Sequence, residues 1–87
     1  MSDREREIKK AILELMADGQ MYAPMLIHSR LLTKKMINIK EIDFFRIMFG
    51  MEETGEVKYW TAEVTEAGKK ETAHFYQITE ESNERQN

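Results

Sequence analysis

The sequence predicts a single α+β domain in which helices come first and a two-stranded hairpin follows. Up to about residue 55, apolar residues recur at helical spacing. Beyond that point the pattern changes to segments rich in β-branched and aromatic residues, separated by a turn signal. A length of 87 residues is enough for one modest core and too short for two.

The first predicted helix covers residues 4–17. Gly19, within the Asp-Gly-Gln stretch that stops it, is suited to cap its end. The following residues 21–23 can form a brief strand. The apolar residues of this helix share one face, and they are Ile8, Ala11, Ile12, Leu15 and Met16.

Two further helices are predicted before residue 55. Pro24 suits the first turn of the second helix, which is expected over 24–32, because its missing N–H would be unpaired there anyway. Asn38 and Glu41 have the spacing of a capping box, which predicts that the third helix opens there and ends near Gly55. The second helix is expected to bury some combination of Leu26, Ile27 and Leu31.

The predicted hairpin turns at Ala67 and Gly68 and joins strands within 56–64 and 71–79. Its register can be written from the side chains. An alternative register, shifted by one residue, would place Trp60 and Phe75 in the core instead. In the preferred register one face carries the pairs Val57–Ile78, Tyr59–Tyr76 and Thr61–His74, and the other carries Trp60–Phe75 and Ala62–Ala73.

The final residues 80–87 are polar and are expected to form a disordered tail. The predicted domain is therefore 1–79.

This order of elements, from helix and short strand through two more helices to a hairpin, resembles the winged helix-turn-helix superfamily over residues 4–79. Residues 22–32 would form the first helix of the helix-turn-helix, and residues 38–60 would run from the third helix into the first strand of the wing. The resemblance implies DNA binding, with the third helix in the major groove and the wing on the backbone or minor groove. A minority of such proteins bind other proteins with the same surfaces.

The composition narrows the classes of partner. A net charge of −3 and a pI near 5.4 give no global attraction to nucleic acid, but they leave room for a local basic patch. The absence of cysteine excludes disulfides, thiolate zinc sites and thiol nucleophiles. The N-terminus lacks the apolar region of a signal peptide, and no apolar run reaches the length of a membrane span. A soluble, cytoplasmic protein without membrane association is expected.

Basic residues support the DNA-binding interpretation. The segment 30–40 contains cations and no acid, and further lysines stand at the expected wing tip, where both groups could neutralise phosphates. The simpler alternative is that surface turns are rich in lysine. The predicted contacts with double-stranded DNA are Arg30, Lys34, Lys35, Lys40, Arg46, Lys69 and Lys70, with Lys40 and Arg46 nearest the bases.

The third helix supports a different interpretation, because its apolar arc is about twice as wide as a core-facing helix needs. Asp43 and Glu53 on this helix would also repel phosphate. The surplus suggests a homodimer or a protein partner. The predicted interface residues are Phe44, Ile47, Met48 and Met51 with the Trp60–Phe75 pair.

The expected function is thus a DNA-binding transcriptional regulator. The alternative is a protein-interaction module without DNA binding. No catalytic site is indicated: His28 and His74 are far apart in the sequence, and there is no phosphate-binding loop or nucleophile elbow. Neither an enzyme nor a metal, cofactor or small-molecule substrate is expected.

Overall fold

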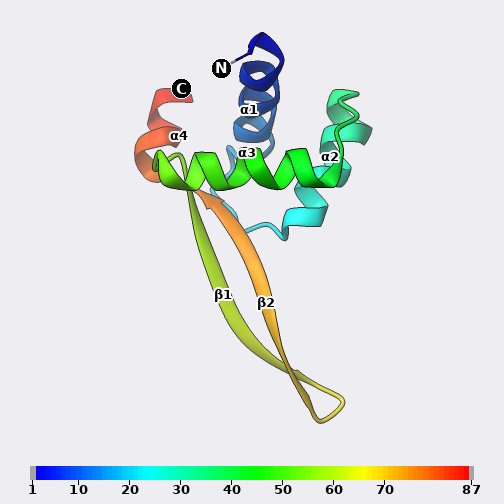
Figure 1. The fold of residues 1–87 in the computed structure, drawn as a ribbon. Coiled ribbons are helices and arrows are strands. Elements are labelled where there is room, and N and C mark those ends of the chain that lie inside the picture. Colours follow the sequence, from blue (N-terminus) through cyan, green and yellow to red (C-terminus); the bar gives the residue numbers. More distant parts are fainter. Residues whose placement is uncertain (1, 87) are drawn as a thin grey trace.

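The structure is a computed structural model that describes residues 2–86, without the side chains of residues 85 and 86. Three helices form a compact body, a long hairpin projects from it, and a fourth short helix returns to the body (Figure 1). This confirms the predicted α+β class and gives a winged-helix-like layout. The elements are α1 (Asp3–Leu15), α2 (Pro24–Lys35), α3 (Glu41–Glu53), β1 (Val57–Glu66), β2 (Lys69–Ile78) and α4 (Glu80–Gln86).

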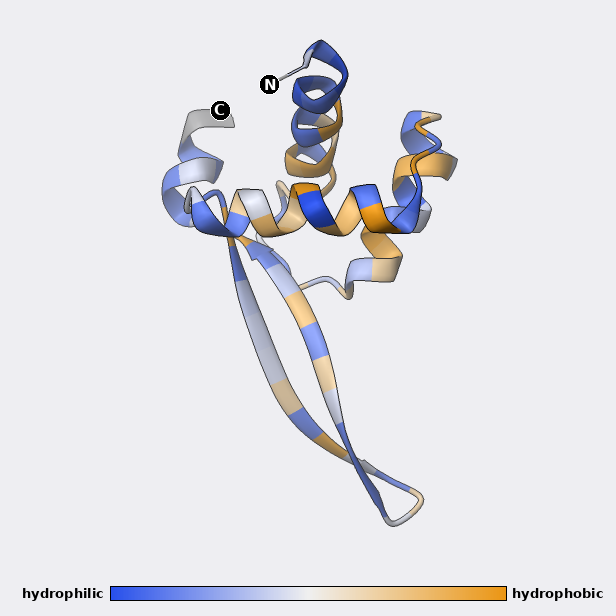
Figure 2. Cartoon of the chain, viewed as in Figure 1, coloured by the Kyte–Doolittle hydropathy of each residue, from blue (hydrophilic) through white to orange (hydrophobic). Residues whose placement is uncertain are grey.

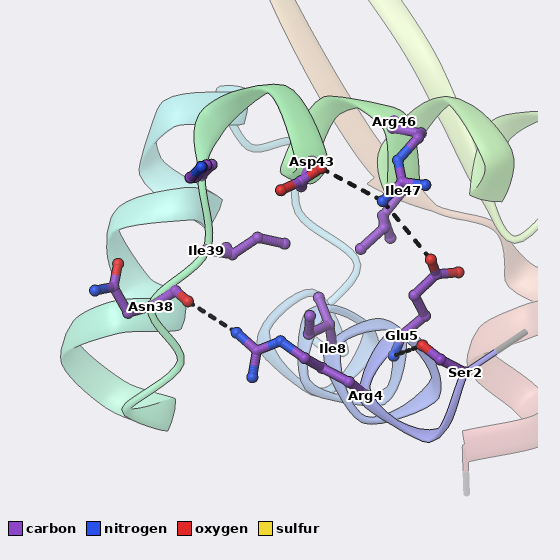
Figure 3. A pocket seen from close by; sticks show the side chains of 10 residues that line it. Ser2, Arg4, Glu5, Ile8, Asn38, Ile39, Asp43, Arg46 and Ile47 are labelled. Atoms are coloured by element: carbon purple, nitrogen blue, oxygen red, sulfur yellow. Dashed lines mark hydrogen bonds and ion pairs between the residues drawn. The ribbon is translucent and has the colours of Figure 1, made fainter.

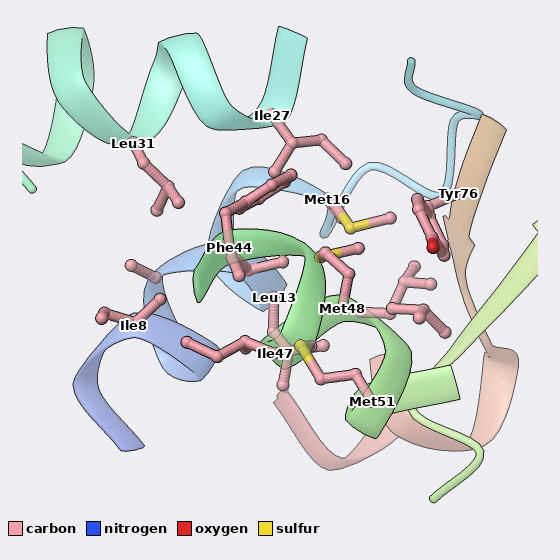
Figure 4. Close-up of a cluster of buried hydrophobic side chains, with 14 residues drawn as sticks. Ile8, Leu13, Met16, Ile27, Leu31, Phe44, Ile47, Met48, Met51 and Tyr76 are labelled. Carbon is pink, nitrogen blue, oxygen red and sulfur yellow. The ribbon is translucent and has the colours of Figure 1, made fainter. Parts of the chain in front are cut away.

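The core lies where α1, α2, α3 and the base of the hairpin meet (Figure 4). Its centre is unusually rich in methionine, whose flexible thioether fills irregular gaps. The fully buried side chains are Ile12 of α1 and Met16 directly after it, Ile27 and Leu31 of α2, Phe44, Met48 and Met51 of α3, and Val57 and Tyr76 of the hairpin.

Helix α2 runs three residues further than predicted, to Lys35. It ends because Met36 adopts a left-handed conformation with φ of 56°, and the Ile37 N–H then reaches back 2.9 Å to the carbonyl oxygen of Leu31. Ile27 and Leu31 are buried as expected, whereas Leu26 is 42% exposed.

The predicted capping box at the start of α3 is wrong. Residues 37–39 belong to no helix or strand, and there Ile37 and Ile39 pack against the core while Asn38 is exposed. The carbonyl oxygen of Asn38 accepts a 2.9 Å hydrogen bond from Arg4, and the N-cap position falls on Lys40, whose side chain makes no cap hydrogen bond. The His28 Nε2 atom, 2.7 Å from the Ile39 carbonyl oxygen, ties this connection to α2.

The predicted hairpin register is confirmed in every pair, from Val57–Ile78 at the base to Ala62–Ala73 further out. Tyr76 is 1% exposed and Trp60 is 43% exposed, so the alternative register is wrong. The brief strand expected at 21–23 is present as one bridge, in which Tyr22 and Tyr76 exchange two backbone hydrogen bonds of 2.8 Å.

The outer part of the hairpin extends beyond the body. Residues 58–72 are exposed on both faces, and the hairpin gives the molecule its 46 Å long axis. Ala67 and Gly68 form the two-residue turn with φ values of 52° and 79°. Positive φ at both central positions defines a type I′ turn, whose twist matches that of the strands.

Residues 80–86 form helix α4, so the prediction of a disordered tail is wrong there; Asn87 lies outside the described residues, as does Met1. The Thr79 hydroxyl accepts a 3.2 Å hydrogen bond from the Ser82 N–H and donates one of 2.9 Å to the Gly55 carbonyl oxygen. Ser82 is 3% exposed, because α4 packs on α1. A threonine followed by two glutamates is the signal for a helix start that could have been recognised in the sequence.

Within residues 2–86, none of the helices combines the length and the apolar character that crossing a bilayer requires.

Candidate functional site

Two of the predicted DNA contacts are engaged by neighbours on the body. The Arg30 guanidinium lies 5.3 Å from the centre of the Tyr22 ring. Lys35 Nζ lies 2.6 Å from Glu14 Oε2, and this hydrogen bond and charge lower the pKa of the Glu14 carboxyl. Lys35 is therefore a link between α2 and α1 more than a free phosphate ligand.

Arg46 and Lys40 line a pocket of about 340 Å³ between the starts of α1 and α3 (Figure 3). Arg46 pairs there with Glu5 at 3.7 Å and with Asp43 at 3.4 Å. Arg4, which the sequence did not single out, enters the pocket from α1. The charged residues that line this pocket are three cations, Arg4, Lys40 and Arg46, and two carboxylates, Glu5 and Asp43.

The remaining predicted contacts do not gather on one surface. Lys34 lies near the end of α2, at the opposite end of the molecule from Lys69 and Lys70 at the wing tip (Figure 1). Lys69 also stands across the hairpin from Glu66. The structure therefore does not bring the two basic clusters together.

The interface predicted on α3 is wrong, because Phe44, Ile47, Met48 and Met51 face the core and are at most 7% exposed. The opposite face of the helix is the exposed one. It presents Ile42, which is 77% exposed, Phe49, which is 56% exposed, and the half-buried Phe45. Both faces are apolar, so helical periodicity alone could not decide which one is buried.

A groove of about 480 Å³ lies between this outer face of α3, the base of the hairpin and the start of α2. We call it the wing groove. It is lined by Ala23, Pro24 and Met25, by Phe45, Phe49 and Glu52 of α3, and by Tyr59, His74 and Tyr76 of the hairpin.

Aromatic rings form two walls of the wing groove. On α3 the ring centres of Phe45 and Phe49 lie 6.0 Å apart. On the hairpin the Tyr59 ring lies 5.4 Å from Tyr76 and 5.8 Å from His74 and stacks on the latter. The Tyr59 hydroxyl is also hydrogen-bonded to His74 Nδ1, which fixes both side chains at the groove.

Glu52 is the carboxylate that lines the wing groove. Among the described residues, no cation forms an ion pair with it. The pKa of the Tyr76 phenol is raised to about 12, mainly because the phenol is buried and secondly because the negative charge of Glu52 is close to it. The groove therefore combines an apolar lining with one uncompensated negative charge.

The other face of the hairpin carries the predicted pair Trp60 and Phe75. Trp60 Nε1 donates a 3.0 Å hydrogen bond to Gln77 Oε1, and Gln77 Nε2 donates one of 2.8 Å to the Gly19 carbonyl oxygen. The indole is thus anchored to the body, with 43% of its surface exposed and Phe75 half-buried opposite it. It lies on the opposite face of the hairpin from the wing groove.

The histidines have no common site. His28 packs its ring 5.1 Å from Phe44 and is part of the body, whereas His74 lies at the groove. In the part of the chain that the structure describes, no group of three or more potential metal ligands occurs.

Comparison of the chain with known proteins finds no matching family model and no significant match among curated proteins or solved structures. The candidate site therefore rests on its own geometry. Helical periodicity places Ile42, Phe45 and Phe49 on one side of α3 but does not identify that side as the exposed one. Nothing in the sequence marked Met25 and Glu52 as site residues, because only the fold brings them to the same groove.

Proposed function

We propose that the chain is a protein-interaction module whose binding surface is the wing groove. The observation that supports this most directly is the exposed apolar surface of the groove, where the lining residues Phe49 and Met25 are 56% and 46% exposed, while Ile42, on the same side of α3, is 77% exposed. Isolated exposed apolar residues are normal, but a contiguous set around a concave site is typical of a surface that binds a partner.

The outer face of α3 is poorly suited to reading DNA. It presents Ile42 and Phe49 together with the carboxylates of Glu41 and Glu52, and a carboxylate repels the phosphate backbone. Arg46, the one cation within this helix, already lies near two carboxylates. The outer face of α3 is therefore better suited to bind a protein than a nucleic acid.

Site-specific photocrosslinking in the source cells tests the proposal. A benzophenone side chain at position 49 should form adducts with a partner, or with a second copy of the chain, whereas the same group at position 7, on the exposed side of α1, should not. The purified partner should then bind the Phe49→Ser variant at least about tenfold more weakly than the wild type, with Glu7→Ser as the control. Adducts that form equally at both positions, or a partner indifferent to Phe49→Ser, would contradict the proposal.

Double-stranded DNA is a second candidate partner, because the start of α3 lacks a side-chain cap while Lys40 and Arg4 lie beside it. A helix N-terminus flanked by cations can hold a phosphate group. Fluorescence anisotropy with a labelled duplex should then show affinity that falls steeply with salt and is lost in the double variant Arg4→Glu, Lys40→Glu. No binding at low salt would exclude this candidate.

A further inference from the structure

The lining of the wing groove indicates what kind of group it accepts. Phe45 and Phe49 stand on one side and Tyr59 on the other, and aromatic rings attract a cation through the negative potential of their faces. Met25 and Pro24 close the third side with apolar surface. No lysine or arginine lines the groove, so an anion would find no permanent positive charge there.

The single carboxylate of the groove gives the same indication. Glu52 follows Phe49 by almost one helical turn, so its side chain lies on the same side of α3. Glu52 lines the groove without an ion-pair partner among the described residues, and its negative charge helps to raise the pKa of the Tyr76 phenol, which lines the same groove. A cationic ligand would both stack on the rings and neutralise this charge.

We propose that the wing groove binds an arginine side chain that an apolar segment of the partner protein presents, with the guanidinium among Phe45, Phe49 and Tyr59 and paired with Glu52. This inference rests on the proposed function. Arginine fits better than lysine, because its planar guanidinium stacks on aromatic rings, pairs with a carboxylate through two hydrogen bonds and is more weakly hydrated. The groove volume of about 480 Å³ exceeds what one side chain fills, so a neighbouring apolar residue of the segment packs beside Met25.

The test uses two synthetic tripeptides with blocked ends, Leu-Arg-Leu and Leu-citrulline-Leu. Citrulline has almost the same shape as arginine but no charge. In NMR titrations of the labelled wild-type protein, we expect the arginine peptide to shift the Met25 methyl and Phe49 ring signals and to bind about three- to tenfold more tightly than the citrulline peptide. A lysine peptide should lie between them. Equal binding of the arginine and citrulline peptides, or no shift at the groove with either, would overturn the inference.

A pair of neighbouring variants identifies the carboxylate responsible. Glu52→Gln should abolish the preference for arginine over citrulline. Glu53→Gln makes the same charge change at a residue that lines a different pocket, beside Lys9 and Gly50, and should keep the preference. If both variants lose it equally, the preference reflects the general field of the protein and the inference is wrong.

The outcomes also separate this inference from the proposed function. Should both peptides bind equally and lose affinity in Phe49→Ser, the groove is a binding site for neutral apolar segments, and the proposed function stands without the arginine. Should neither peptide bind and the crosslinked partner be indifferent to Phe49→Ser, both fail. Chemical-shift dispersion of each variant shows whether it is folded.

Discussion

The two faces of α3 have similar compositions and opposite environments. On the inner face Phe44, Met48 and Met51 are completely buried, whereas on the outer face Ile42 and Phe49 are mostly exposed. Figure 2 shows hydrophobic residues along most of this helix, interrupted by a few charged positions. The inner face is buried because α1, α2 and the base of the hairpin all converge on it. The outer face keeps much of its apolar surface exposed, so this surface is available to a partner.

The largest difference in stability is expected between substitutions of phenylalanines on the two faces of α3. Phe44→Ala should destabilise the domain by about 3–5 kcal/mol, because it leaves a cavity in the core. Phe49→Ala should change stability by less than about 1 kcal/mol, since that ring is already mostly in water. Urea unfolding followed by circular dichroism measures both. Similar losses in the two variants would show that the outer face is also structural.

A smaller effect is expected at Tyr76, whose ring is buried in the core while it also lines the groove. Burial raises its pKa to about 12 in the folded state, above the value near 10 of an unfolded chain. The folded state therefore holds this proton more tightly. The stability that the protonated Tyr76 phenol contributes is fully present below about pH 10 and is lost as the pH rises towards 12.

The measurement is the free energy of unfolding from pH 9 to pH 12. Tyr76→Phe should reduce the alkaline loss. Tyr22 also has a raised pKa, because of its hydrogen bond to Asp18, so part of the loss should remain in this variant. An unchanged alkaline loss in Tyr76→Phe would mean that the phenol is not buried as described.

The smallest effect is expected at the wing tip, which touches neither face of α3. Ala67 adopts a φ of 52°, a left-handed conformation that Asn or Gly adopts more readily. Ala67→Asn should stabilise the outer hairpin by a few tenths to about 1 kcal/mol. Hydrogen exchange of the amides in residues 61–73 should slow, with little change in α3. The same substitution at Thr65, inside the strand, serves as the control and should not slow exchange.

The order of elements and the hairpin register were predictable from local patterns. The turn at Ala67 and Gly68 fixes the register, and the alternation of apolar residues on either side agrees with it. The breaks at Gly19 and Gly55 likewise depend on the residue at one position. Signals of this kind are contained in a few consecutive residues.

The buried side of α3 and the membership of the groove were not predictable. A helix that is apolar on both sides gives no information about which side its neighbours cover. Phe44 was therefore expected at an interface although it is buried, and the exposed Phe49 was not named. The pairing of Lys35 with Glu14 depends on how α2 packs against α1. These contacts join residues far apart in the sequence, and only the fold determines them.

The projecting hairpin has a consequence for how far the protein can reach. Beyond its base the hairpin is exposed on both faces, so the length of its strands is not fixed by the core. Removing the adjacent pairs Glu63–Thr72 and Val64–Glu71 would shorten the arm by about 7 Å and leave every remaining side chain on its present face. The wing is in this sense an arm of adjustable length, whose reach can change in steps of two residue pairs while the groove at its base keeps the same shape.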